Sequence, residues 1–373
     1  MEKVMSRKLI SISTIMTLMS TSVMADVPNV AADIAPIHSL VSRVMDGVGE
    51  PKLVIQSGAS PHGYRLRPSE AKALQDANLI FWMGEELTPW LDGAIDTLAS
   101  NSSVTSLLDQ EGVVLHDFRE GALFEVHDHS AHDEHDDHDD HDDHKDHDDH
   151  DDHDDHKDHD DHDDHDDHDD HKDHDDHDDH EDHDDHEDHD DHDDHDDHDD
   201  HGHGAHDPHA WLSPENAKLW LNIIASKLSV ADPENAANYF TNAAAGQAEI
   251  EEMISEVSAT LKPVKGGKFV VFHDAYQYFE NDFDFYASGA ISLSDASDPS
   301  PARIAKVQRR IRDEGIQCVL AEPQFNQGLV ATVMEGSNAT ASVIDPLGAD
   351  IKPGPKLYTQ LIKNMAKTLR DCL

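Results

Sequence analysis

The sequence predicts an α/β protein with two doubly wound α/β lobes, a long rigid helix that joins them, and a disordered His/Asp-rich loop inserted in the N-terminal lobe. Three observations support this prediction. Short apolar runs alternate with amphipathic stretches on both sides of residues 127–206, as in parallel sheets covered by helices on both faces. Apolar residues then recur at helical spacing over residues 233–261. Finally, His and Asp repeat with a period of three in the inserted tract.

Each lobe is expected to contain four strands. These strands cover residues 27–31, 52–56, 79–83 and 104–107, then 268–272, 284–287, 317–321 and 341–344. The expected helices cover residues 36–46, 68–76, 88–99 and 214–228, then 274–281, 301–314, 326–336 and 355–368. Ser213-Pro214 and Ser300-Pro301 are helix-start signals, because a capping hydroxyl precedes a proline at the first helical position. Gly315 ends the helix that Ser300 begins.

The long helix is expected from Pro233 to Leu261, and Pro263 stops it. Its length of about 29 residues corresponds to roughly 43 Å, which is too long for one small lobe. We therefore divide the chain into the following segments: signal peptide 1–25, N-terminal α/β lobe 26–115, His/Asp-rich loop 116–206, remainder of the N-terminal lobe 207–232, linker helix 233–262 and C-terminal α/β lobe 263–373. In such sheets, ligands bind beyond the carboxyl ends of the strands, which here face the cleft between the lobes.

The net charge of −54 arises mainly in the tract. Residues 127–206 contain 28 His and 44 Asp or Glu but only 3 Lys, and so carry −41. The other 293 residues carry −13 and have the apolar content of a globular protein. This excess of acid excludes nucleic acid as a partner, because phosphate would be repelled.

The N-terminus has the three parts of a secretory signal. Lys3, Arg7 and Lys8 precede an apolar run at 9–19, and small residues at 23 and 25 predict cleavage after Ala25. The alternative is a membrane anchor, for which about 11 apolar residues are short of the ~20 that a span needs. In an exported chain, the even count of Cys318 and Cys372 favours a disulfide over metal ligation or two free thiols.

Three of the five histidines outside the tract are candidate metal ligands. His62 lies in a loop that follows a strand, His273 ends the first strand of the second lobe, and His209 precedes a helix start. Three imidazoles suit Zn²⁺, which accepts nitrogen ligands in a tetrahedral shell. We expect His38 to be a surface or packing residue, and His116 has no assigned role.

Five segments in family order resemble the metal-binding cluster of ABC-transporter substrate-binding proteins, and within it the zinc-uptake (ZnuA-type) members. They are GASPHGYRLRPS (58–69), DPHAWLSPEN (207–216), FHDAYQYFE (272–280), AEPQF (321–325) and IDPLG (344–348). The resemblance implies a periplasmic, monomeric protein that binds Zn²⁺ in the inter-lobe cleft and delivers it to an inner-membrane ABC zinc permease.

The same resemblance assigns roles to individual residues. It makes His62, His209 and His273 the metal ligands, and it favours zinc because manganese members carry Glu at the position of His273. In those members an Asp at the position of Asp345 completes the site, whereas some zinc members have an acidic residue where this chain has Pro61. The fourth ligand is therefore either Asp345 or water. The resemblance also pairs Cys318 with Cys372.

The tract offers many weak, interchangeable sites for Zn, Ni or Cu, because imidazoles alternate with carboxylates. We interpret it as a low-affinity metal collector or sensor, and the alternative is a repeat expansion without a selected role. The histidines taken to represent this secondary metal loop are His127, His129, His132, His135, His138, His201, His203 and His206.

Other functions remain as alternatives to zinc delivery. Three histidines with an open position also occur in zinc hydrolases, but the chain has no HExxH motif and Glu322 is the only plausible general base. A manganese- or nickel-binding homologue is a second alternative. A pure metal sponge would not require the ordered lobes.

Overall fold

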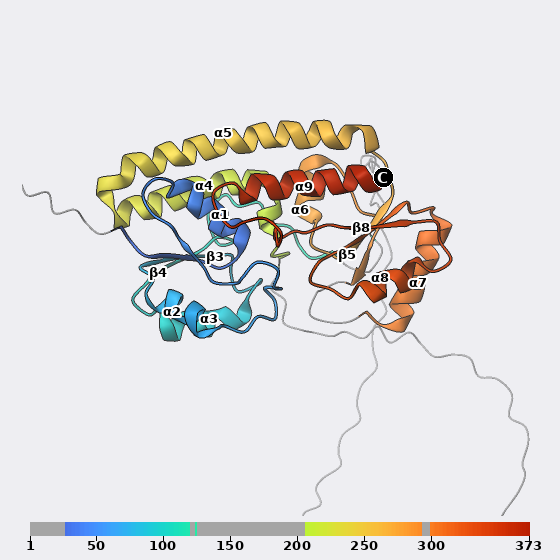
Figure 1. Ribbon diagram of the computed structural model, residues 1–373, viewed down its shortest axis with the longest axis horizontal. Coiled ribbons are helices and arrows are strands. Elements are labelled where there is room, and N and C mark those ends of the chain that lie inside the picture. The colour runs from blue at the N-terminus through green and yellow to red at the C-terminus, as the bar shows by residue number, and fades with distance from the viewer. Residues whose placement is uncertain (1–26, 120–123, 125–205, 293–298) are drawn as a thin grey trace, which may run out of the picture. The chain divides into compact units, whose positions relative to one another are not determined.

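The computed structural model describes residues 27–119, 124, 206–292 and 299–373 (Figure 1), all of which belong to one compact unit. The predicted signal peptide and the tract histidines from His127 to His203 lie outside the described residues. His206, at the end of the tract, is described.

Two four-stranded parallel sheets form the framework. The first has the order β2-β1-β3-β4 and the second the order β6-β5-β7-β8, so the strands follow the same relative order in both. The bounds are β1 Val30–Ala32, β2 Lys52–Leu53, β3 Leu79–Trp82, β4 Ser103–Ser106, β5 Phe269–His273, β6 Ala290–Ser292, β7 Cys318–Ala321 and β8 Thr340–Val343.

Helices cover both faces of each sheet, which confirms the predicted two doubly wound lobes (Figure 1). α1 and α4 lie on one side of the first sheet and α2 and α3 on the other, while α7 and α8 lie together beside the second sheet. The bounds are α1 Ala35–Val44, α2 Pro68–Gln75, α3 Pro89–Leu98, α4 Pro214–Ala231, α6 Gln277–Phe283, α7 Pro301–Asp313, α8 Gln327–Met334 and α9 Leu357–Cys372.

Local chemistry sets the predicted helix ends. The Ser213 hydroxyl accepts a hydrogen bond from the backbone N–H of Asn216, and Ser300 does the same for Arg303, each at 3.3 Å. Each cap satisfies one of the N–H groups that the first helical turn leaves without a partner. Gly315 follows α7 with a φ of +66°, a left-handed conformation that glycine adopts without steric cost.

The predicted long helix is α5, which spans Ala236–Leu261. A 3₁₀ turn at Pro233–Asn235 precedes it, so the α-helix begins three residues later than predicted. Its 26 residues extend about 39 Å. α5 packs against α1 and α4 in the first lobe and against α9 in the second. α9 also contacts α1, a contact that was not predicted from the sequence. Two helices, α5 and α9, therefore pack against both lobes.

One apolar cluster extends through both lobes along the α5 side. In β5, Phe269 and Val271 belong to this cluster, whereas Val270 and Phe272 belong to a second cluster under α7 and α8. Successive side chains of a strand point to opposite faces, so a strand buried on both faces is a continuous apolar run. This run brings His273 to the carboxyl end of β5 in a buried position.

The strand predicted at residues 284–287 is wrong. Asp284 adopts a left-handed conformation that ends α6, and the strand of this region, β6, begins only at Ala290. Phe285 is buried because its ring stacks on Phe269, with 5.5 Å between ring centroids. Its burial reflects a packed connection, and an apolar pattern alone does not distinguish this from a strand.

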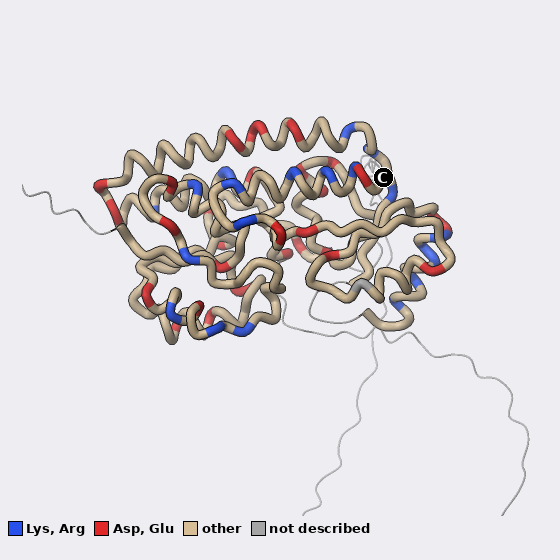
Figure 2. The backbone as a smooth tube through the Cα atoms, in the orientation of Figure 1, with Lys and Arg blue, Asp and Glu red and all other residues tan. Residues whose placement is uncertain are grey.

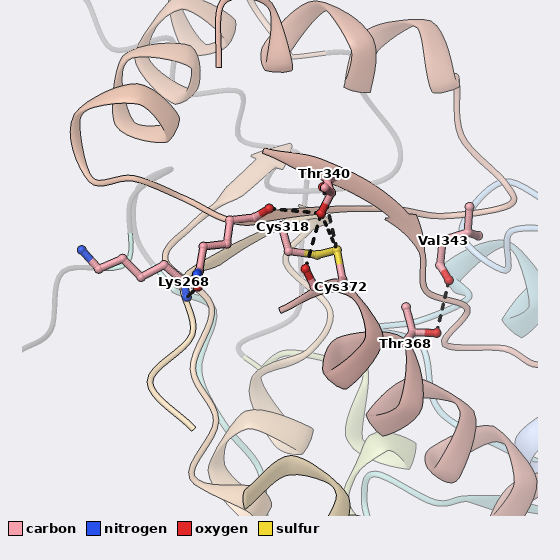
Figure 3. The surroundings of a disulfide bond; sticks show 7 residues. Lys268, Cys318, Thr340, Val343, Thr368 and Cys372 are labelled. Carbon is pink, nitrogen blue, oxygen red and sulfur yellow. Dashed lines mark hydrogen bonds between the residues drawn. A yellow bond between two sulfur atoms is a disulfide. The ribbon is translucent and has the colours of Figure 1, made fainter. Parts of the chain in front are cut away.

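The predicted disulfide between Cys318 and Cys372 is present (Figure 3). It joins the start of β7 to the last turn of α9 across a separation of 54 residues. The Thr340 hydroxyl lies 3.5 Å from Cys372 Sγ. The disulfide therefore ties α9, the helix that also contacts α1, to the second sheet.

Figure 2 shows Lys and Arg interspersed with Asp and Glu over the described elements, so the charge outside the tract is distributed. No described helix has the length and apolarity to cross a membrane.

Candidate metal centre

His62 lies in the loop between β2 and α2. The indole N–H of Trp90 donates a 2.7 Å hydrogen bond to the carbonyl oxygen of Pro61, and the backbone N–H of His62 donates to the Ser60 hydroxyl at 3.3 Å. These bonds hold the loop next to α3, which carries Trp90. They leave the His62 side chain partly buried.

His209 immediately precedes the 3₁₀ turn Ala210–Leu212, which leads into α4. The Trp211 indole N–H donates a 2.8 Å hydrogen bond to the carbonyl oxygen of Pro346, in the loop after β8. The turn is thus linked to the second lobe, and His209 is buried with only 5% of its surface exposed.

The three predicted histidines come together. His209 Nε2 lies 3.4 Å from His62 Nε2 and 3.4 Å from His273 Nε2. In a tetrahedral zinc shell with Zn–N bonds of about 2.05 Å, two ligand nitrogens are about 3.3 Å apart. Over the described residues, no group of three or more His, Cys, Asp or Glu is already set to hold a metal ion. The three imidazoles nonetheless show two nitrogen separations of the size that such a shell requires.

Two buried carboxylates orient two of these rings. Asp207 Oδ1 lies 2.6 Å from His209 Nδ1, and Glu322 Oε1 lies 2.7 Å from His273 Nδ1. A carboxylate accepts, so in each neutral ring Nδ1 carries the proton and Nε2 presents its lone pair. Both carboxylates are 1% exposed. Burial raises the pKa of Asp207 to about 6, against the opposing effect of its bond from the His209 backbone N–H.

A small cavity lies at the convergence of the imidazoles. It offers about 10 Å³ to a water-sized group, which is room for about one water molecule. Besides the three histidines, its lining includes Trp211, Glu322, Gln324, Phe325 and Leu347.

Asp345 is not among the residues that line this cavity. Its carboxylate accepts hydrogen bonds from three backbone N–H groups, those of Leu347, Gly348 and Ala349, at 2.9, 3.0 and 2.5 Å. In this structure, Asp345 stabilises the turn that follows β8.

The other described histidines lie apart from the three. His38 is buried, with Nε2 3.1 Å from the carbonyl oxygen of Pro51, and burial lowers its pKa. It is a packing residue, one of the two roles expected for it. His116 packs its ring against Tyr278. His206 Nδ1 lies 2.9 Å from the Asp117 carboxylate.

The two ends of the His/Asp-rich loop (residues 116–206) meet close to the centre. Asp117 and His206 form an antiparallel bridge, and the backbone N–H of Asp207 donates to the carbonyl oxygen of His116 at 2.8 Å. Asp207, which orients His209, therefore also belongs to this junction.

Arg119 fixes the first end of this loop to the second lobe. Its Nε donates to both Asp274 oxygens at 3.0 Å, and its Nη1 donates to Glu280 at 2.5 Å. The guanidinium carbon also lies 3.6 Å from the centroid of the Phe124 ring. Burial raises the pKa of Glu280 to about 7, and Arg119 opposes this rise.

Asp207 and the orienting role of Glu322 were not predicted from the sequence. A signal was present for both, because Asp207 lies two residues before His209 and Glu322 directly follows a buried strand. Gln324 was also missed, because an amide in a loop has no distinguishing pattern.

Comparisons with known proteins identify the family. The model of the family described as ZnuA, the periplasmic zinc-uptake complex component A, matches residues 30–372. The chain belongs to this family. It is 45% identical over 344 residues to the high-affinity zinc uptake system protein ZnuA of Brucella abortus (strain 2308), covering 92% of this chain and 91% of the relative.

A second relative supports the same family, and two solved structures show the same fold. The chain is 41% identical over 350 residues to the protein of that name from Paracoccus denitrificans, covering 94% of this chain and 93% of the relative. A crystal structure of ZnuA has the same fold, with a TM-score of 0.63, 17% identity and coverage of 93% and 99% of the two chains. A zinc-bound ZnuA variant lacking residues 138–173 of its own sequence also has a TM-score of 0.63, with 17% identity and coverage of 93% and 98%.

Proposed function

We propose that the protein captures one Zn²⁺ in the periplasm through the Nε2 atoms of His62, His209 and His273, and delivers it to an inner-membrane ABC permease. The convergence of these atoms is the observation that carries the proposal. Membership of a periplasmic zinc-uptake family supports the compartment and the cargo. Cleavage after Ala25 and a monomeric state are part of the same proposal.

Asp207 and Glu322 supply further support. Ligating histidines usually donate their second ring N–H to a carboxylate or carbonyl group, which fixes the ring. The two buried carboxylates also balance the 2+ charge of the ion. An all-imidazole set suits zinc better than manganese, which prefers oxygen ligands.

The hydrolase alternative is less well supported. Glu322 was the only candidate general base, and its carboxylate is engaged by His273 Nδ1 at 2.7 Å. A carboxylate that is bonded to a metal-ligating histidine orients that histidine and is poorly placed to activate a water molecule.

Replacing Glu322 with Gln is expected to weaken zinc binding about 10- to 100-fold, because the ring of His273 loses its charged acceptor. Competition against a chelator of known zinc affinity measures the change. Glu335→Gln, an exposed residue of the same lobe, is the matched control and should leave the affinity unchanged. Equal affinities for Glu322→Gln and the unaltered protein would contradict the orienting role.

Deleting residues 127–200 while keeping the junction at Asp117 and His206 is expected to leave one tight zinc site and remove many weak ones. Isothermal titration calorimetry of both forms counts the sites. Weak binding by the full chain should collapse below about pH 6.5, where protonated imidazoles no longer bind metal. Loss of the tight site on deletion would overturn the assignment of the three histidines.

A further inference from the structure

Gln324 has an unexplained amide in the wall of the candidate centre. It lies in the loop between β7 and α8, and its side chain lines the same cavity as the three histidines. Both Oε1 and Nε2 are shielded from solvent and have no hydrogen-bond partner among the described residues. A buried polar group without a partner costs free energy, so each such group calls for a physical explanation.

The loop around Gln324 is anchored on both sides. Glu322 is bound to His273 Nδ1 at 2.7 Å. The Phe325 ring stacks on Phe272 with 4.5 Å between centroids and 5° between planes, and it meets His273 edge-on at 5.3 Å. Gln324 therefore sits between two residues that are each fixed against the His273 side of the cavity.

The three imidazoles alone leave the zinc shell incomplete. They leave one position of a tetrahedral shell open, and Gln324 lines the same small cavity. Asp345, the carboxylate that could fill this position, is engaged by three backbone N–H groups and does not line the cavity.

We propose that a water molecule completes the zinc shell and that Gln324 holds this water by accepting a hydrogen bond at Oε1. A metal-bound water gives one lone pair to the ion, and its O–H groups become stronger hydrogen-bond donors, so an acceptor such as Oε1 stabilises it. The amide is neutral, and the charge of the ion is already balanced by Asp207 and Glu322. Gln324 is thus a positioning residue. The inference rests on the proposed zinc site.

Gln324→Leu separates this role from a structural one. Leu removes the acceptor and the unpaired amide together, so the metal-free variant should melt at the same temperature as the unaltered protein or higher. Zinc affinity should nevertheless fall about 10-fold. Asp345→Asn is the comparison variant and should retain the zinc affinity of the unaltered protein.

Half an equivalent of Co²⁺ added to the full chain tests for the water itself. A bound water ionises far below its value in bulk solvent, so the visible spectrum of the unaltered protein should change reversibly between pH 7 and 10. The midpoint should shift in Gln324→Leu and stay in place in Asp345→Asn.

Two results would overturn the inference. The first is a spectrum of the unaltered protein that does not depend on pH over this range. The second is an unchanged affinity and midpoint in Gln324→Leu together with a large loss of affinity in Asp345→Asn, which would make Asp345 the fourth ligand. A His209→Ala variant that keeps the full Co²⁺ spectrum would instead refute the zinc site itself, so the two failures are distinguishable.

Discussion

His209→Ala is expected to lower the affinity of the tight zinc site by roughly 10²- to 10⁴-fold. His209 is the central imidazole, since its Nε2 lies 3.4 Å from the Nε2 atoms of both His62 and His273. If three ligands share a binding free energy of about 10–16 kcal/mol, the loss of one costs about 3–5 kcal/mol. The variant also leaves Asp207 buried without its imidazole partner.

Chelator competition at less than one equivalent of zinc per full chain measures this loss, because the tightest site fills first. His38→Gln is the matched control, since His38 is also buried but bonds to the carbonyl oxygen of Pro51. It should keep the tight site. An affinity that is the same in His209→Ala and His38→Gln would show that zinc binds elsewhere.

Arg119→Met is expected to destabilise the protein by about 3–5 kcal/mol, because it leaves buried carboxylates without their cation. The Asp274 and Glu280 side chains are only 7% and 1% exposed, and Arg119 itself is 18% exposed. Arg119→Lys should lose less, since it keeps the charge but lacks the planar fork that binds two carboxylates. Urea unfolding followed by tryptophan fluorescence measures both variants.

The destabilisation should be larger at pH 8 than at pH 5.5. Folding raises the pKa of Glu280 to about 7. The protonated Glu280 carboxyl therefore favours the folded state, fully so below the pKa of the unfolded chain, and this contribution is lost as the pH rises through 7. Arg119 opposes this rise, and its removal moves the pKa further up and increases the penalty at pH 8. Arg370→Met, which breaks an exposed pair with Asp371, should cost less than about 1 kcal/mol at either pH. A loss in Arg119→Met that does not depend on pH would contradict this account.

The sequence by itself determined the framework. Alternating apolar and amphipathic stretches predicted both parallel sheets, because a strand buried on both faces must be apolar throughout. Ser213 and Ser300 fixed two helix starts through bonds within one turn. His62 and His273 could be selected because both follow strands, and ligands bind beyond the carboxyl ends of parallel strands; His209 precedes a helix start, and the family resemblance supported all three. The count of two cysteines favoured a disulfide, and the family resemblance paired Cys318 with Cys372.

Only the tertiary structure decided how these parts act together. The second link between the lobes through α9 and the orientation of His273 by Glu322 both depend on contacts between segments far apart in the sequence, which no local pattern encodes. The prediction of a strand at residues 284–287 was wrong for the same reason, because Phe285 is buried by the ring of Phe269 from β5. Local hydrogen bonds and hydrophobic periodicity depend on residues that are close in the sequence, so the sequence predicts them. The partner of a buried polar side chain is set by the packing of segments distant in sequence, and that packing also left the buried Gln324 amide in the wall of the cavity.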